Sequence, residues 1–382
     1  MIQSFIFHGF KMSELRRFNI SVFIKIIGRS LIGIFIPIFL YKNGFSIFEI
    51  LLFYGLISIA FVALGGIGTR LISKIGAKHA ILLSAFFEIT FFLLMPFVVS
   101  HYWLLLILPI IFAIEMILFN ISYHLIFTLD SHTKNRGREI ANVGMLVVLA
   151  GIVSPFIGGI IADLNFTLLF LISAGFILLS SLPLLFTKDL YQNLDFKIKD
   201  VWKNIFKKSE RGNTLSFASY GAEHIINVVI WPIIIISIVG SLEKTGLIVS
   251  ASAVISLITY KIIGHLSDTL ENKKLIKLGT YLHSVAWFTR IFVQNMYSII
   301  VIDSYKNIAQ KILHVPWTNQ SYTLAMKNNF YEFIVRKEYI FHLSRIFLYI
   351  LLGLVFWINI APFTITLIIA GITSLGYKFI NS

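Results

Sequence analysis

Residues 264–274 read Gly-His-Leu-Ser-Asp-Thr-Leu-Glu-Asn-Lys-Lys. This is one of the few strongly polar runs in the second half of the chain, and a long apolar segment lies on each side of it. Apolar segments of about 20 residues are long enough to cross a hydrocarbon core of about 30 Å. The stretch therefore predicts a short polar loop that connects two membrane-spanning helices.

A related loop lies in the first half of the chain. Residues 69–79 read Thr-Arg-Leu-Ile-Ser-Lys-Ile-Gly-Ala-Lys-His, and apolar segments again flank them. The two loops are about 195 positions apart, roughly half the length of the chain, and many transporters are built from internal repeats. The sequence therefore indicates a duplicated architecture.

The composition is that of a membrane protein. Of the 382 residues 57% are hydrophobic and only 13% are charged, whereas a soluble globular protein has about 25% charged residues. The mean hydropathy is +0.86. Because the apolar runs are continuous rather than alternating, and because lipid cannot satisfy exposed backbone groups, the spans are expected to be helices. A soluble domain is excluded.

The distribution of charge predicts the topology. The net charge is +14. Roughly 23 of the 32 Lys and Arg residues fall in loops on one side, about two fall on the other and about seven lie within spans. This asymmetry puts both termini in the cytoplasm and favours contacts with anionic lipids over binding of nucleic acid. The chain has no cysteine, which excludes disulfides and Cys metal sites.

Hydropathy indicates about twelve spans in two groups of six, joined by a polar segment. The predicted spans of the first group are 19–41, 46–68, 78–100, 102–129, 140–162 and 165–186. Those of the second group are 214–239, 245–264, 275–293, 297–324, 333–357 and 361–379. The predicted domains are thus an N-terminal bundle at 1–186, a linker at 187–213 and a C-terminal bundle at 214–382. Met12 is a possible alternative start to Met1.

The linker carries apolar residues at helical spacing with lysines opposite. They are Ile198, Val201, Trp202, Ile205 and Phe206. We expect an amphipathic helix on the cytoplasmic leaflet; the alternative is a solvated linker. No loop exceeds about 30 residues, too few for a soluble catalytic domain of at least about 50 residues.

The loop at 264–274 resembles the short cytoplasmic loop of the major facilitator superfamily of secondary transporters, through Gly264, Asp268, Lys273 and Lys274. The first-half loop matches less well, because Ser73 stands where the family usually has Asp. The resemblance implies an all-α fold of two pseudo-symmetric six-helix bundles, alternating access and a monomer. It also implies that the loop residues bridge to neighbouring helix ends and hold the outward-open state. In the first half, the resemblance assigns this bridging role to Gly76 and Lys78. The alternative for both loops is a solvated charged turn without a role in gating.

The fifth predicted span contains a second motif of this kind. Small residues surround a proline and are followed by a glycine pair, at Gly151, Pro155, Gly158 and Gly159. This pattern is similar to the fifth-helix motif of the same family, where it permits close packing and a bend. In the antiporter version a Gly precedes the proline, whereas here Ser154 does.

Polar residues at membrane depth form stripes on four spans, and each ionisable one requires a partner or a function. The first span carries Lys25 and Arg29, and the fourth carries Glu115, Asn120 and His124. The seventh carries Tyr220, Glu223, His224, Asn227 and Trp231, and the tenth carries Asp303, Lys306, Asn307, Gln310 and His314. The resemblance implies that these four helices line one central cavity.

Candidate roles follow from the chemistry of each side chain. A carboxyl group held partly out of water keeps its proton more readily, so Glu223 is the leading candidate proton carrier. Further candidates are Glu115, His224 and Asp303. Arg29 stays charged, so it either binds an anionic group of the substrate or neutralises Glu115 or Glu223.

Each of these residues also has a structural interpretation. Glu115 could pair with Arg29, His224 could be a packing residue, and Asp303 could pair with Lys306. The tryptophans, including Trp231, could stack on a substrate or simply pack. Four further ionisable residues lie in or near spans. Arg290 and Arg345 are expected to pair or reach an interface, Glu338 is expected to meet an inner-loop arginine, and Glu88 has no evident partner.

The sequence thus favours a proton-coupled transporter of a small solute in the cytoplasmic membrane of a bacterium, working by alternating access. Alternatives are an uncoupled facilitator, a lipid flippase or, less favoured, a membrane-embedded transferase. We find no nucleophile elbow and no phosphate-binding Gly-Lys-Ser/Thr motif, and no His/Asp/Glu cluster at the spacing of metal ligands. Enzymatic activity, a cofactor and a metal are therefore not expected.

Overall fold

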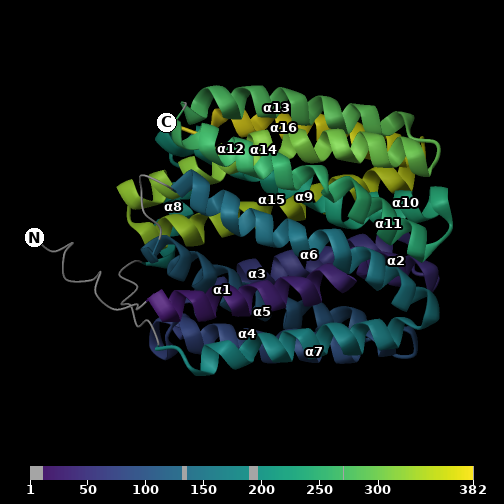
Figure 1. The fold of residues 1–382 in the computed structure, drawn as a ribbon, viewed down its shortest axis with the longest axis horizontal. Coiled ribbons are helices and arrows are strands. Elements are labelled where there is room, and N and C mark those ends of the chain that lie inside the picture. The colour runs from purple at the N-terminus through teal and green to yellow at the C-terminus, as the bar shows by residue number, and fades with distance from the viewer. Residues whose placement is uncertain (1–11, 131–135, 189–196, 270, 382) are drawn as a thin grey trace, which may run out of the picture.

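The computed structural model describes residues 12–130, 136–188, 197–269 and 271–381, and every regular element in these ranges is a helix. Figure 1 shows two groups of roughly parallel helices, with the start of α1, the end of η6 and all of α8 at one end of the bundle. We call this end the termini side and the opposite end the far side. The predicted all-helical membrane fold is confirmed.

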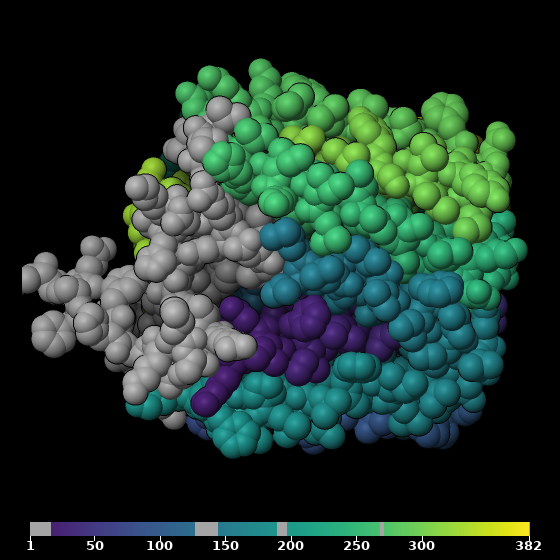
Figure 2. Space-filling model, in the orientation of Figure 1, coloured from purple at the N-terminus to yellow at the C-terminus, as the bar shows by residue number. Residues whose placement is uncertain are grey.

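The helices of the first half run from α1 to α7. They are α1 (Met12–Ile32), α2 (Phe35–Lys42), α3 (Ile47–Ile75), α4 (Ala77–Leu94), η1 (Met95–Val99), α5 (Leu104–Asp130), α6 (Arg136–Leu164) and α7 (Phe166–Leu185). Figure 2 shows the purple atoms of α1 bordered by those of α6 and α7, against which it packs. Two short connecting helices follow, α8 (Ile198–Ile205) and η3 (Lys208–Glu210).

The helices of the second half run from α9 to η6. They are α9 (Arg211–Ile225), η4 (Ile226–Ile230), α10 (Trp231–Val239), α11 (Leu242–Ala253), α12 (Ile255–Thr269), α13 (Asn272–Thr289), η5 (Arg290–Phe292), α14 (Met296–Lys327), α15 (Phe330–Ile358), α16 (Pro362–Ser374) and η6 (Leu375–Phe379).

Each predicted span corresponds to one helix or to helices that follow one another directly, such as α9, η4 and α10. Within the described ranges, ten of these segments are long and apolar enough to cross a membrane by themselves. The other two, α13 and α14, have 18 and 32 residues. They fall short in composition rather than length, because they carry charged residues such as Asp303 and Lys306, which are buried.

Two of the spans are interrupted close to the middle of the molecule. The first breaks between α1 and α2 at Gly33, whose amide donates to the carbonyl oxygen of Arg29 at 2.8 Å. The seventh contains the π-helical turn η4, directly before Pro232 at the start of α10. Such π-helical turns occur frequently at functional sites, and this one places Asn227 and Val228 beside the cavity described below.

The two halves meet along two lines of contact, α6 against α11 and α12, and α3 against α15. At the first line the backbones approach closely. A Cβ added at Gly159 would meet the Leu242 carbonyl oxygen at 2.5 Å, and one at Gly246 would overlap the Pro155 carbonyl oxygen. Gly158 lies equally close to α1 at Leu31. The structure thus places most of the fifth-span motif at these contacts, while Gly151 faces open space.

Gly246→Ala is expected to destabilise the protein by about 1–3 kcal/mol, because the new methyl group has no room against α6. Gly175→Ala is the matched control. No atom lies within 4 Å of a Cβ built there, so helix propensity alone predicts a gain of up to about 1 kcal/mol. Unfolding of both purified variants measures the difference. Equal stability would contradict the packing assigned to the α6–α11 contact.

The structure corrects the environment predicted for the linker helix. Val201 and Ile205 of α8 are buried, Trp202 packs edge-on against Tyr339 of α15, and Ile198 lies against α3 at Gly66. The apolar face therefore packs on protein rather than on lipid. Phe206, 75% exposed, is the member of the predicted apolar face that stays open.

Candidate functional site

A cavity of about 490 Å³ lies between the two halves. Side chains of α1, α2, α3, α4, α5 and α6 line it from the first half, and side chains of η4, α10, α11, α12, η5 and α14 line it from the second. Its surface is largely apolar and aromatic. The ionisable groups on it, tyrosine apart, are Arg29, Glu88, Arg290, Asp303, Lys306 and Lys311.

The first half contributes a cluster of four charges, which we call the first-half charge cluster: Lys25, Arg29, Glu88 and Glu115. Lys25 Nζ lies 2.6 Å from Glu88 and 3.1 Å from Glu115. Arg29 reaches Glu88 at 2.6 Å and Glu115 at 2.5 Å. Both cations lie over the ring of Phe119, at 4.2 and 4.7 Å from its centroid. Positive and negative charges balance within this cluster.

This geometry provides the partner that sequence reasoning did not find for Glu88. It also selects one alternative for Arg29, which pairs with Glu115 and Glu88 and not with Glu223. The Arg29 side chain is 32% exposed, whereas Glu88 and Glu115 are fully buried. A buried charge is tolerated only where it is paired and hydrogen-bonded, so each member of the cluster depends on the others.

In the second half, Arg290 forms the main ion pair at the cavity. Its Nη2 and Nε donate to Asp303 Oδ1 at 2.7 and 3.0 Å, and its Nη1 donates to Asn227 at 3.1 Å. The guanidinium lies between the rings of Trp231 and Trp287, at 4.0 and 4.3 Å from their centroids. Trp231 also donates to Asp303 Oδ2 at 2.9 Å.

The pairing suggested between Asp303 and Lys306 is therefore wrong, because Arg290 and Trp231 occupy the carboxylate. Lys306 is 3% exposed and donates to Gln310 Oε1 at 3.1 Å. It forms no ion pair with the carboxylates of the described chain. Asn307, one residue further on, donates to the Ser252 carbonyl oxygen at 2.8 Å and ties α14 to α11.

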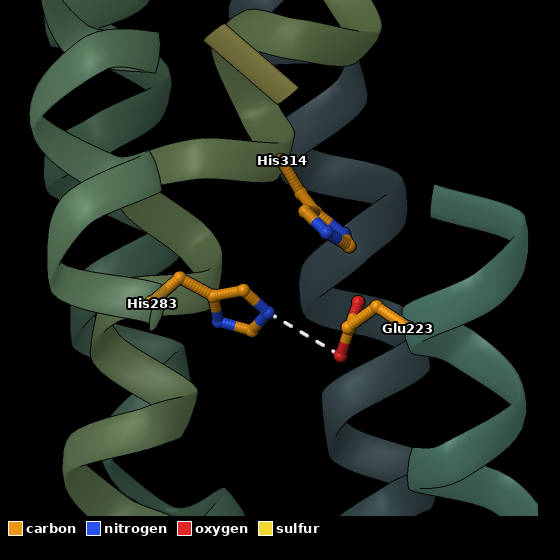
Figure 3. A group of neighbouring side chains, drawn as sticks. All are labelled: Glu223, His283 and His314. Carbon is orange, nitrogen blue, oxygen red and sulfur yellow. Dashed lines mark ion pairs between the residues drawn. The ribbon is translucent and has the colours of Figure 1, made fainter. Parts of the chain in front are cut away.

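Glu223 lies inside the second half, behind the cavity wall. Trp287 Nε1 donates to its Oε1 at 3.1 Å, and Tyr377 Oη donates to its Oε2 at 2.9 Å. His283 Nε2 is 3.3 Å from Oε1, and His314 Nε2 is 3.3 Å from the Tyr377 hydroxyl. Figure 3 shows the two imidazoles and the carboxylate converging from three helices. We call these five residues the Glu223 group.

The Glu223 group contains a set of potential metal ligands, which corrects the sequence interpretation that no such cluster exists. One ligand atom each from Glu223, His283 and His314 lie within 4.8 Å of one another, and one carboxylate with two imidazoles suits a transition metal ion. Both carboxylate oxygens already accept hydrogen bonds, however, and Lys306 interacts with the same charge. Trp287 and Tyr377 thus satisfy the carboxylate without a metal ion, so we treat the group as an acid–base site.

Several predicted site residues lie toward the termini side of the cavity. The ring of His224 stacks on Tyr220 at 5.5 Å between centroids, and Tyr220 stacks on Trp317 at 5.3 Å. This arrangement supports the packing interpretation of His224. Asn120 of α5 is partly buried. None of the side chains in this region lines the cavity.

The halves also contact each other through polar groups on the termini side. His124 Nδ1 of α5 lies 2.7 Å from the Tyr322 hydroxyl of α14, and its Nε2 lies 3.6 Å from Glu338 of α15. The partner of Glu338 is thus a histidine of the other half, not the inner-loop arginine expected. On the far side α2 contacts α10. Contacts between the halves therefore exist at both ends of the cavity.

The predicted loop residues make contacts within their own half. Lys78 donates to the Thr187 carbonyl oxygen at 2.5 Å, just after α7, and Gly76 ends α3 with a φ of 87°. Lys274 pairs with Glu271 at 3.2 Å in an exposed position, and Lys273 is exposed. Gly264 is buried in α12. The side chain of Asp268 lies outside the described residues.

Tyr322→Phe is expected to open the termini side more often, because it removes the hydroxyl that His124 binds. One hydrogen bond of about 1 kcal/mol corresponds to an approximately fivefold change in population. The chain has no cysteine, so Ser252→Cys supplies a unique thiol at the cavity. An impermeant thiol reagent added on the termini side should label it about five times faster in the Tyr322→Phe background. Asp200→Asn, at an exposed carboxylate of α8 on the same side, should leave labelling unchanged.

Comparison with known proteins identifies the fold. The model of the Major Facilitator Superfamily matches residues 18–210. The chain belongs to the major facilitator superfamily. It is therefore a secondary transporter by family and not an enzyme. The comparison with curated proteins gave no match.

Solved structures of the fucose:proton symporter FucP have the same fold. The E. coli protein, as a single-residue variant, is 13% identical, with a TM-score of 0.67 over 96% of this chain and 98% of that one. FucP in the outward conformation is also 13% identical, with a TM-score of 0.69 over 95% and 96%. At this identity the likeness concerns the fold alone. In major facilitator terms, α1–α2, α5, α9–α10 and α14 are the first and fourth spans of each half.

Three residues of the site were missed by sequence reasoning as partners: Glu88, His283 and Arg290. Each lies in a span outside the four striped ones, and His283 and Arg290 share the predicted span 275–293. The sequence offered one signal for them: an ionisable residue within an apolar span needs a partner in the membrane. The sequence could not show which stripe each one faces.

Proposed function

We propose that this transporter moves a small solute by alternating access and couples its movement to protons. The observation that carries the proposal is Glu223, a carboxylate that is 1% exposed and has an imidazole nitrogen 3.3 Å away. A proton can reside on the carboxylate or on either histidine while the hydrogen bonds from Trp287 and Tyr377 hold the group in place. Buried ionisable groups with specific charged or titratable partners are frequent at functional sites.

The remaining features fit this proposal. The two halves, 1–186 and 214–382, would rock about the cavity, and the linker 187–213 would tether them. The excess of basic residues in loops on the termini side supports cytoplasmic termini and a cytoplasmic-membrane location. We propose a monomer, with Glu115 of the first-half charge cluster as a secondary site for a proton.

A proton that binds at Glu223 would change the electrostatic interaction of this carboxylate with the ionisable groups around it. Facing it are His283 of α13, Lys306 and His314 of α14, Arg290 of η5 and Tyr377 of η6. Lys306 and Arg290 also line the cavity. A change of charge at Glu223 is therefore felt at the cavity, which is the requirement for coupling.

The test uses the purified protein in proteoliposomes. A thermal-stability screen against a solute library at two pH values identifies a ligand, since a ligand at a hundredfold excess over Kd stabilises by about 2.7 kcal/mol. Entrapped pH-sensitive dye then reports proton movement when that solute is added. We expect alkalinisation or acidification that requires the solute. Solute movement without proton movement would establish an uncoupled facilitator, and stabilisation by particular lipids alone would favour a flippase.

A further inference from the structure

We propose that the solute is a small organic anion with an apolar or aromatic body, and that Lys306 binds its anionic group. This inference rests on the central cavity being the solute site, as proposed above.

The cavity carries excess positive charge. Among the ionisable groups that line it, tyrosine apart, four are basic and two are acidic, so the basic groups exceed the acidic ones by two. Lys25 and Glu115, directly behind the wall, cancel each other. Counting Glu223 as ionised still leaves an excess of one. A cavity with excess positive charge attracts anions and repels cations.

The hydrogen bonds and ion pairs of the four basic groups indicate which of them is available to bind an anion. Arg29 is engaged by two carboxylates, and Arg290 is engaged by Asp303 and Asn227. Lys311 is partly exposed and lies 4.9 Å from the centroid of the Tyr260 ring. Lys306 differs from the two arginines because no carboxylate pairs with it among the described residues, and from Lys311 because it is only 3% exposed and water cannot compensate it. Of the three donors of its ammonium, one goes to Gln310.

An unpaired buried ammonium is costly unless a counter-charge compensates it. The anionic group of a solute in the cavity would supply that counter-charge. It would also accept hydrogen bonds from the two remaining N–H groups of Lys306. Arg29 and Arg290, which are already paired with carboxylates of their own half, would add a favourable electrostatic field without direct contact. Lys306 is therefore the group expected to select for charge.

The rest of the lining indicates the body of the solute. Aromatic rings are supplied by both halves, from Tyr54, Phe92, Phe112 and Trp231. The two cavity asparagines are already engaged, Asn227 by Arg290 and Asn307 by the Ser252 carbonyl oxygen. A volume of about 490 Å³ falls within the range of small-molecule sites. These features fit an aryl or alkyl carboxylate or phosphate better than a neutral polyol.

The position of Lys306 also connects anion binding with the proton. Its charge interacts with those of Glu223, Arg290, Asp303 and Lys311. When Glu223 binds a proton, one negative charge near Lys306 disappears and the cavity becomes more attractive to an anion. By thermodynamic reciprocity the anion then favours proton binding. Proton and anion are expected to bind together.

The experiment compares matched ligands on the full chain in nanodiscs. Probes are 3-phenylpropionate, hexanoate and phenyl phosphate, each against an uncharged counterpart such as 3-phenylpropionamide. Binding is read from thermal stability and from tryptophan fluorescence, since Trp231 lines the cavity. We expect at least one anion to bind, with its neutral counterpart at least tenfold weaker.

Variants assign the effect to one residue. Lys306→Gln should weaken binding of the anion at least tenfold, Lys306→Arg should restore part of it, and Lys244→Gln, at an exposed lysine of α11, should leave it unchanged. Without ligand, Lys306→Gln should be at least as stable as the native chain, because it removes an unpaired buried charge. This readout separates a ligand site from a structural lysine.

The inference is overturned if neutral counterparts bind as well as the anions, if none of the anions binds, or if Lys306→Gln binds them with native affinity. Its failure is distinguishable from that of the proposed function. A neutral solute that moves with protons would overturn the anion inference alone. An anion that binds through Lys306 but moves without protons would overturn the coupling alone.

Discussion

Glu223→Gln is expected to abolish proton-driven accumulation of the solute while leaving its exchange across the membrane intact. Glutamine can accept the hydrogen bond from Trp287 and stay beside Tyr377, so the fold of the second half should be preserved. It cannot take up a proton. With a pH gradient as the driving force, the ratio of internal to external solute should fall to unity.

The measurement is uptake of labelled solute into proteoliposomes with and without the gradient. Asp200→Asn, which changes an exposed carboxylate of α8 on the termini side, is the matched control and should accumulate solute like the native chain. Counterflow of labelled against unlabelled solute should persist in Glu223→Gln. Accumulation at the native level in that variant would remove Glu223 as the proton carrier and direct attention to Glu115.

Glu88→Ala is expected to cause the largest loss of stability, about 3–5 kcal/mol, because it leaves Lys25 and Arg29 with one carboxylate between them. Removing one partner of a buried pair costs far more than removing the whole pair. The double change Lys25→Met with Glu88→Met should therefore recover most of the loss, since Arg29 and Glu115 still balance each other.

Unfolding of the ligand-free protein in detergent, followed by circular dichroism, measures both effects. Ser84→Ala on the same helix is the control. Ser84 is fully buried and is reached by Lys25 only at 3.5 Å, so its loss should cost about 1 kcal/mol. A Glu88→Ala protein as stable as Ser84→Ala would show that the first-half charge cluster contributes little.

The fold was predictable because the bilayer leaves few choices. Continuous apolar runs in a chain with two related loops allow only a duplicated helical bundle. The ends of the helices could not be predicted to the residue. The first span was expected at 19–41 and extends over Met12–Ile32 and Phe35–Lys42, because hydropathy locates the membrane and not the helix ends.

The site was half predictable. Helical periodicity grouped Arg29, Glu115, Glu223 and Lys306 with other polar residues on one face of each helix, and so marked them as candidates for the site. Their partners could not be derived, because pairing depends on how separate helices pack. His283 is 60 positions from Glu223 in the sequence, yet its imidazole lies 3.3 Å from the carboxylate. For the same reason the Glu223 group was not recognised as a set of possible metal ligands.

All ion pairs lining the cavity are confined to one half or the other. The first-half charge cluster joins α1, α4 and α5, and Arg290 joins Asp303 within η5 and α14. Among the described residues, none of these ion pairs has to break for the two halves to separate at the cavity. The charged groups that do link the halves lie at the ends of the cavity, Glu338 beside His124 on the termini side and Asp163 beside the Glu243 amide on the far side. Within the cavity, a bound anion would therefore act as a removable tie between two preassembled bodies.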